Sequence, residues 1–156
     1  MRRSDKLINE TEVIEQILNE SSICRIAFSI DGEAHIVPVN FGYKNNKLYI
    51  HSAPEGQKID FIKKNNRICF EMELDHEIVK DKVACNWTTK YRSVIGHGIV
   101  SVIHEKSQKI EGLDIIMSKY GGPDKNTYTD AILKKMILLV IEIDTLTAKQ
   151  SGKWSK

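Results

Sequence analysis

The feature that most constrains the fold is an alternating run of residues that ends in a hairpin turn. Apolar residues alternate with polar or small ones over residues 24–30, as in a half-buried strand. Asp31 and Gly32 follow directly, and both tolerate the positive φ of a two-residue turn. We therefore expect an antiparallel hairpin whose return strand covers residues 34–41. Pro38 cannot donate a ladder hydrogen bond, so it predicts an edge strand or a bulge.

The rest of the chain does not alternate strands and helices strictly. Periodicity predicts further strands over residues 48–50, 68–74, 91–103 and 138–143. It also predicts three helices: one that begins after an Asn9 cap, one over 58–64 and one over 110–120. Residues 75–90 are expected to form a loop, and residues 124–135 a loop with a brief helix. This order favours an antiparallel barrel with helices packed outside over a doubly wound parallel sheet. With no internal repeat or linker, we expect a single domain over residues 1–156.

Charge and composition argue against several function classes. The 156 residues include 23 basic and 21 acidic side chains, mixed along the chain, for a net charge of +2. Nucleic-acid binders usually concentrate basic charge on one face, so a DNA or RNA role is disfavoured. The sequence has no CxxC pair and therefore predicts no metal site of that kind. No apolar run reaches membrane-spanning length and no leader opens the chain, so we expect a soluble cytoplasmic protein with no membrane contact.

Residues 51–58 combine features of an anion-binding loop. A short apolar strand leads into His51, and Gly56 and Lys58 stand at the start of a predicted helix. Backbone N–H groups at a helix start lack partners and favour negative charge. A lysine there adds a point charge suited to phosphate. The segment therefore predicts a binding site for an anionic group.

Three segments recur together, in order, in one family. They are Val37-Pro38-Val39-Asn40, then Leu48-Tyr49-Ile50-His51-Ser52-Ala53 with Gly56 and Lys58, then Tyr91-Arg92-Ser93-Val94-Ile95-Gly96. Through them the chain resembles the flavin-binding split-barrel proteins related to pyridoxamine 5′-phosphate oxidase. Within these it is most similar to the nitroimidazole-resistance branch of small FMN-binding reductases. The resemblance implies a mainly β, six-stranded antiparallel split barrel with flanking helices, and a homodimer with two FMN molecules in grooves between the subunits.

The resemblance also implies a division of the cofactor site. Lys58, Ser52 and Gly56 would bind the phosphate, and Arg92 and Ser93 on a separate strand would complete that clamp. The strand from Val37 to Asn40 would line the ring edge, and Trp154 would cover the flavin or substrate slot. Ile50 and Val94 would contact the ring through their backbone or their side chains. The complete predicted set is Val37, Pro38, Val39, Asn40, Ile50, His51, Ser52, Ala53, Gly56, Lys58, Arg92, Ser93, Val94 and Trp154.

His51 is the expected catalytic residue. In the nitroimidazole branch a histidine of this motif lies near the flavin ring, and an imidazole with a pKa of about 6.5 is a suitable proton donor near neutral pH. Each role has an alternative. His51 would instead only close a strand, Lys58 would be a solvated lysine, Arg92 would pair with a nearby carboxylate, Ser93 would serve the strand ladder, and Trp154 would be an unengaged terminal residue.

The expected activity is that of an FMN-dependent oxidoreductase. It would reduce a small aromatic or nitro compound, as a 5-nitroimidazole reductase does, with electrons from NAD(P)H or another donor. Two alternatives stay open: a pyridoxamine 5′-phosphate oxidase-like enzyme, and a flavin-binding protein without turnover. Another flavin or a haem in the groove is also compatible with the sequence.

Overall fold

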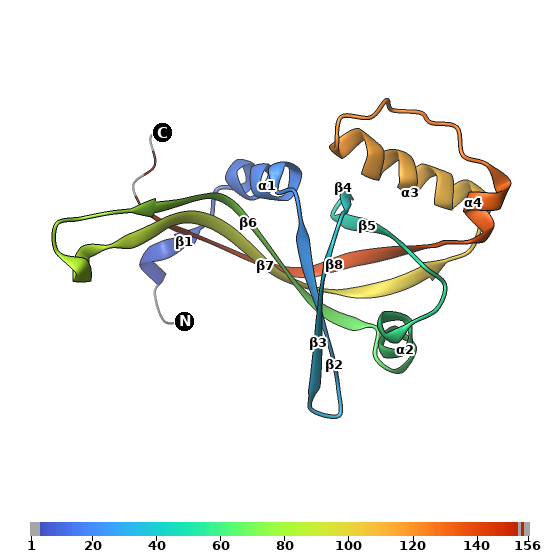
Figure 1. Ribbon diagram of the computed structural model, residues 1–156, viewed down its shortest axis with the longest axis horizontal. Coiled ribbons are helices and arrows are strands. Elements are labelled where there is room, and N and C mark those ends of the chain that lie inside the picture. The colour runs from blue at the N-terminus through green and yellow to red at the C-terminus, as the bar shows by residue number, and fades with distance from the viewer. Residues whose placement is uncertain (1–3, 153, 155–156) are drawn as a thin grey trace.

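The computed structural model describes residues 4–152 and residue 154. The chain forms, in order, η1 (Ser4–Lys6), β1 (Leu7–Ile8), α1 (Thr11–Glu20), β2 (Cys24–Ile30), β3 (Glu33–Val39), β4 (Gly42–Lys44), β5 (Lys47–Ser52), α2 (Gln57–Lys64), β6 (Arg67–Val79), η2 (Ala84–Asn86), β7 (Thr88–Ile103), α3 (Lys106–Lys119), α4 (Asp130–Lys134) and β8 (Ile137–Ser151) (Figure 1).

All strand pairs are antiparallel and belong to one sheet. The strand order is β3-β2-β6-β7-β8-β5-β4, and β1 pairs with β8. The expected mainly β, antiparallel fold with helices outside is confirmed. The expected count of six strands is wrong: the described residues form eight, because the two-residue β1 and the three-residue β4 add to the six predicted strands.

The predicted hairpin is present between β2 and β3. Asp31 and Gly32 have φ of 52° and 85°, as a turn with two positive-φ residues requires. β3 lies at the end of the strand order and, within residues 4–152, pairs only with β2. Pro38 therefore occupies an edge strand, as predicted, where its missing N–H costs no ladder hydrogen bond.

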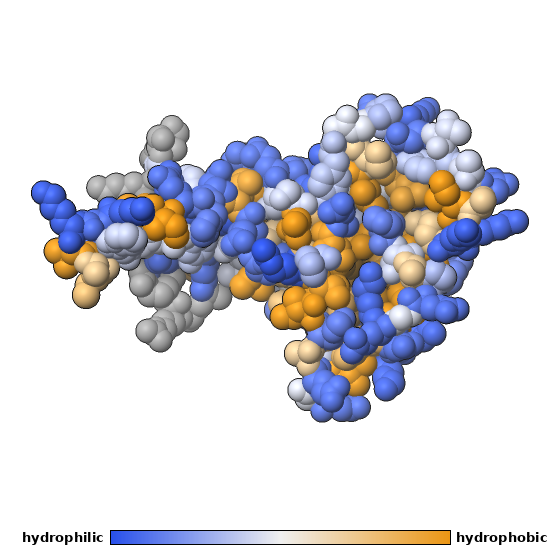
Figure 2. All heavy atoms as spheres, viewed as in Figure 1, coloured by the Kyte–Doolittle hydropathy of each residue, from blue (hydrophilic) through white to orange (hydrophobic). Residues whose placement is uncertain are grey.

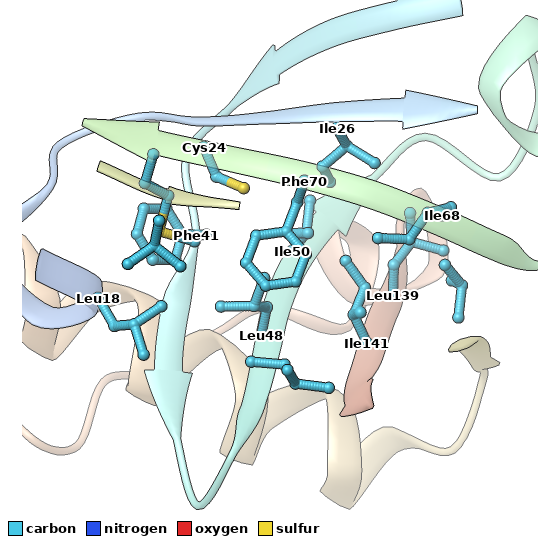
Figure 3. Close-up of a cluster of buried hydrophobic side chains, with 14 of the residues drawn as sticks. Leu18, Cys24, Ile26, Phe41, Leu48, Ile50, Ile68, Phe70, Leu139 and Ile141 are labelled. Atoms are coloured by element: carbon cyan, nitrogen blue, oxygen red, sulfur yellow. The ribbon is translucent and has the colours of Figure 1, made fainter. Parts of the chain in front are cut away.

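The sheet coils around one cluster of buried apolar side chains. Phe70 from β6 and Ile26 from β2 face Leu48 and Ile50 from β5 and Leu139 from β8, and all five are at most 1% exposed (Figure 3). Since successive side chains of a strand point to opposite faces, the residues between these in each strand face helices or solvent on the other side of the sheet. The helix α3 lies over the opposite face of β5 and β8, where a Cβ on Gly112 would come within 2.3 Å of Leu138.

The expected loop over residues 75–90 is largely a hairpin. β6 continues to Val79 and β7 already begins at Thr88, after a bulge at which Asp75 has a φ of 60°. This two-stranded arm extends away from the body of the molecule (Figure 1). Hydrophobic side chains are exposed at its outer end (Figure 2). They include Val83 and Trp87, and the free thiol of Cys85 is exposed there as well.

β8 is also longer than predicted. It was expected over residues 138–143 and continues to Ser151, because its polar second half pairs with β7 and its residues 148–149 also pair with β1. No helix of the described residues combines the length and apolar character needed to cross a membrane.

Candidate functional site

The segment from His51 to Lys58 joins the end of β5 to the first turn of α2. Gly56 precedes the helix with a φ of 115°, a conformation that glycine adopts at little cost. Its carbonyl accepts hydrogen bonds from the N–H groups of Ile59 at 2.8 Å and Asp60 at 3.1 Å. A Cβ added at Gly56 would have no neighbour within 4 Å, so the space in front of the helix is open.

The start of α2 has unused donors. No side chain caps the helix, and within the described residues the N–H groups of Gln57 and Lys58 have no acceptor. The ammonium of Lys58 is half-buried and forms no hydrogen bond or ion pair with the described part of the chain. Burial lowers the pKa of Lys58. This combination, a partly desolvated cation beside free N–H groups, is suited to binding an anion.

His51 and Ser52 point to opposite sides of β5. Ser52 is buried and its hydroxyl donates to the carbonyl of Ala53 at 3.0 Å. His51 is exposed and pairs through its backbone with Leu138 of β8. Among the residues that the structure describes, the imidazole has no hydrogen-bond partner. The His51 side chain is therefore free to meet a ligand, whereas the Ser52 hydroxyl already has an acceptor.

The side chains of two predicted ring contacts lie in the core. The side chains of Ile50 and Val94 are buried in the central cluster, at 1% and 0% exposure, so only their backbone could reach a ligand. Val37 and Val39 are half-buried and pack against the same cluster, while Pro38 and Asn40 are exposed. Ala53 is exposed at the end of β5.

Arg92 forms the ion pair that was its alternative reading. Its Nε donates to Oδ2 of Asp75 at 2.8 Å, a second guanidinium nitrogen contacts the same carboxylate, and Nη1 donates to Oε1 of Gln16 at 2.8 Å. The Arg92 side chain is only 12% exposed. Neither Asp75 nor Gln16 was predicted to hold it, because the sequence separations of 17 and 76 residues give no local signal.

Trp154 covers Arg92 within the same chain. The indole centroid lies 4.7 Å from Cζ of Arg92 and 4.2 Å from Nζ of Lys90. The indole Nε1 donates to the carbonyl of Ser151 at 3.2 Å. Cation–π contacts of this kind stabilise the tail against β7. Ser93 is half-buried beside this cluster and serves the ladder between Glu73 and Lys149.

The two halves of the predicted site lie far apart in one chain. Ile103 of β7 pairs with Leu138, which pairs with His51, so these three residues lie level across the sheet. Arg92 lies eleven residues back along β7. At the usual rise of a strand this separation is roughly 35 Å, far more than one flavin can span. Figure 1 agrees, since α2 lies near one end of β7 and the β6–β7 arm at the other.

A large hollow on the surface lies elsewhere. It has a volume of about 910 Å³ between α1, β4 and α3, and includes Tyr43, Glu111 and Lys119. No predicted site residue lines it. Gln57 of the His51–Lys58 segment lines a smaller hollow of about 300 Å³, and a deeper slot there would need a second surface opposite.

Comparison with known proteins places the chain in a family. Residues 10–150 match the family described as pyridoxamine 5′-phosphate oxidase. An uncharacterized protein of Rhizobium meliloti is 30% identical over 61 residues, which is 39% of this chain. The chain covers only 40% of the length of that curated relative.

Solved structures show the same fold. A candidate 5-nitroimidazole antibiotic resistance protein from Bacteroides thetaiotaomicron matches with a TM-score of 0.82 and 32% identity, over 92% of this chain and 86% of the other. An FAD and heme binding protein from Mycobacterium smegmatis matches with a TM-score of 0.84 and 19% identity, over 97% and 76%. A flavocytochrome of Azotobacter vinelandii matches with a TM-score of 0.80 and 16% identity, over 98% and 72%. The last two likenesses concern the fold alone.

Proposed function

The chain belongs to the pyridoxamine 5′-phosphate oxidase family, and from this premise we propose that it is an FMN-dependent oxidoreductase. It would reduce a small aromatic or nitro compound with electrons from NAD(P)H or another donor. The likeness to the Bacteroides thetaiotaomicron protein, at 32% identity over 92% of the chain, supports the nitroimidazole reductase-like reading. FMN when bound supplies the redox chemistry, and the protein supplies orientation, electrostatics and access.

The observation that carries the proposal is the first turn of α2. Within the described residues, the N–H groups of Gln57 and Lys58 and the half-buried Lys58 ammonium have no partner, and the space beside Gly56 is open. This donor set fits a phosphate group, which needs cationic and N–H donors around it. We assign Lys58, the helix start and Gly56 to the phosphate end of FMN.

His51 would serve the opposite end of the cofactor. It is exposed on β5, five residues before Gly56, and its imidazole is not engaged by any described side chain. Such a group can hold a proton at the edge of the site and donate it to a reduced substrate. Its neighbour Ser52 is held by the Ala53 carbonyl and would position the end of the strand rather than transfer protons.

A second copy of the chain would complete the site. Arg92, Ser93 and Trp154 lie at the far end of β7, roughly 35 Å of strand from the level of His51, so they are not expected to meet the same FMN as the His51–Lys58 segment of their own chain. A two-fold arrangement, in which the Arg92 end of one copy faces the His51–Lys58 segment of the other, removes this difficulty and supplies the missing wall. The proposed functional unit is therefore a homodimer with FMN between the subunits.

The absorption spectrum of the purified protein tests the cofactor. Bands of an oxidised flavin, with FMN released on denaturation, are expected; a haem band or FAD would show another cofactor. A colourless protein that neither binds added FMN nor gains thermal stability from it would refute the proposal. Anaerobic turnover of a nitroaromatic acceptor with NAD(P)H separates an enzyme from a binding protein. His51→Ala should keep FMN and lose most turnover, and unchanged turnover would remove His51 from the catalytic role.

A further inference from the structure

A small basic cavity lies beyond the end of β7, next to the His51 end of the sheet. Its volume is about 240 Å³. Its lining consists of His104, Lys106, Lys109, Asp130, Leu133 and Lys134. Sites for drug-sized ligands usually exceed roughly 300 Å³, so this cavity is too small for a flavin and suits a small ion or one charged group of a ligand.

The charge of the cavity is not balanced by the protein. Lys106 pairs with Asp130, with Nζ and Oδ1 2.7 Å apart. Lys109 and Lys134 have no carboxylate partner among the described residues. A cavity with three lysines and one carboxylate has an excess of positive charge, and such a site attracts anions.

Lys109 makes this excess unusual because it is buried. Lys109 is only 7% exposed. A lysine is rarely buried without a partner that neutralises its charge. Nζ donates to the carbonyl of Leu133 at 2.9 Å and to that of Met136 at 2.7 Å. These contacts tie the end of α4 to α3. The two carbonyls accept from two of the three N–H donors of the ammonium, and neither carries a full negative charge. One N–H donor and the positive charge of Lys109 are therefore left without a partner among the described residues.

The cavity is close to His51 along the sheet. Met136 precedes Ile137, which pairs with Ser52, and His104 follows Ile103, which is level with His51. The Cα atoms of Ile103 and His51 flank Leu138 and are therefore roughly 10 Å apart. The cavity nevertheless does not include Lys58 or Gly56, so it is distinct from the proposed phosphate end of FMN.

We propose that this cavity is a second anion site, which binds a phosphate or carboxylate group. The group is either a free anion or the anionic end of the molecule reduced beside His51. The first alternative is independent of the proposed flavin function, and the second rests on it. The two need separate experiments.

Inorganic phosphate is the probe for the site itself. Its binding to the protein as purified is measured by calorimetry at pH 7.5 and constant ionic strength, in wild type, Lys134→Met and Lys135→Met. Lys134 lines the cavity, whereas its exposed neighbour Lys135 does not, which makes a matched pair. Loss of one ion pair at contact distance in water should weaken phosphate binding roughly fivefold in Lys134→Met, with Lys135→Met unchanged.

Two results would overturn the assignment: no phosphate binding by wild type, or equal weakening by both substitutions. The same titration in Lys58→Met separates this cavity from the proposed FMN phosphate site. If Lys58→Met still binds phosphate, and this binding depends on Lys134, the result supports the inference. If Lys58→Met loses all phosphate binding, the phosphate binds at α2 and the inference is refuted.

The source of the anionic group is read from turnover of the FMN-loaded protein. Two acceptors of similar shape are compared, 4-nitrobenzoate and the neutral 4-nitrobenzyl alcohol. If the group belongs to the reduced molecule, Lys134→Met raises KM roughly fivefold for the benzoate alone, and phosphate competes with it. If Lys134→Met changes KM equally for both acceptors, while the wild-type protein binds phosphate, the cavity is assigned to a free anion.

Discussion

Replacing Lys58 by methionine separates a phosphate-binding lysine from an ordinary helix lysine. At about 4 Å, two unit charges attract each other by about 1 kcal/mol in water and about 4 kcal/mol at the effective dielectric of a protein surface. Lys58 is half-buried, so an intermediate value of about 2 kcal/mol is reasonable. We therefore expect the Kd for FMN to rise about thirtyfold in Lys58→Met.

The same substitution should not destabilise the ligand-free protein. Burial lowers the pKa of Lys58, which means that the folded chain disfavours its charged form. No described carboxylate compensates this cost. Methionine keeps the apolar stem and removes the charge, so the free energy of unfolding should stay equal or rise by a few tenths of a kcal/mol at most, because solvent screens the exposed part of the ammonium.

FMN affinity is measured by quenching of flavin fluorescence, and stability by urea unfolding without ligand. Lys63→Met is the control, since Lys63 lies on the same helix but is exposed in its last turn. A Kd for FMN within twofold of wild type would refute the assignment of Lys58. So would a loss of more than 1 kcal/mol in the ligand-free variant, because it would show a structural role for the ammonium that the described contacts do not contain.

Three further predictions concern the scaffold. Gly98→Ala should lower the free energy of unfolding by about 2 kcal/mol in urea, because its Cβ would lie 2.4 Å from the carbonyl oxygen of Glu142. Tyr120→Phe should cost about 1 kcal/mol in the same assay, since it leaves the Phe41 N–H without its 3.2 Å acceptor. Burial lowers the pKa of Lys119 from 10.5 to about 8. Above pH 8 the unfolded chain thus holds a proton that the folded chain lacks, so wild type should gain stability relative to Lys119→Met as pH rises from 7.5 to 9, and a flat difference would contradict this.

Local patterns predicted the strands well because their information is local. Alternation over residues 24–30 and the Asp31-Gly32 turn each need only neighbouring residues to be read, and β2, β3 and the turn are present as expected. The cap of the first helix was wrong. The helix begins at Thr11 after Glu10, whose carboxylate accepts from the N–H of Asn9, so the expected Asn9 cap does not form.

The arm and the end of β8 were missed for the opposite reason. Residues 75–79 and 144–151 are mostly polar, and their side chains give no buried face to a periodicity argument. They form strands because their backbones pair with β7. Ladder hydrogen bonds are indifferent to side-chain polarity, so extension of a hairpin beyond the core is the part of a sheet that sequence patterns predict least.

The predicted site residues show where reasoning from motifs stops. The motifs of residues 37–40, 51–58 and 91–96 were predicted to form one site because they occur together in one family. Their order along the chain, however, does not say how far apart they lie in the folded sheet. Among the described residues Lys58 has no partner, while Arg92, at the far end of β7 from His51, is held by Asp75 and Gln16. In the proposed dimer, each chain would therefore supply two half-sites: the His51–Lys58 segment, and an Arg92 end whose guanidinium already has partners. If a second copy joins them, Arg92 must either keep Asp75 and act through Trp154 and the backbone, or exchange that carboxylate for the phosphate. Asp75→Asn decides between these: tighter FMN binding would show exchange, and unchanged binding would leave Arg92 a structural cation that positions the tail.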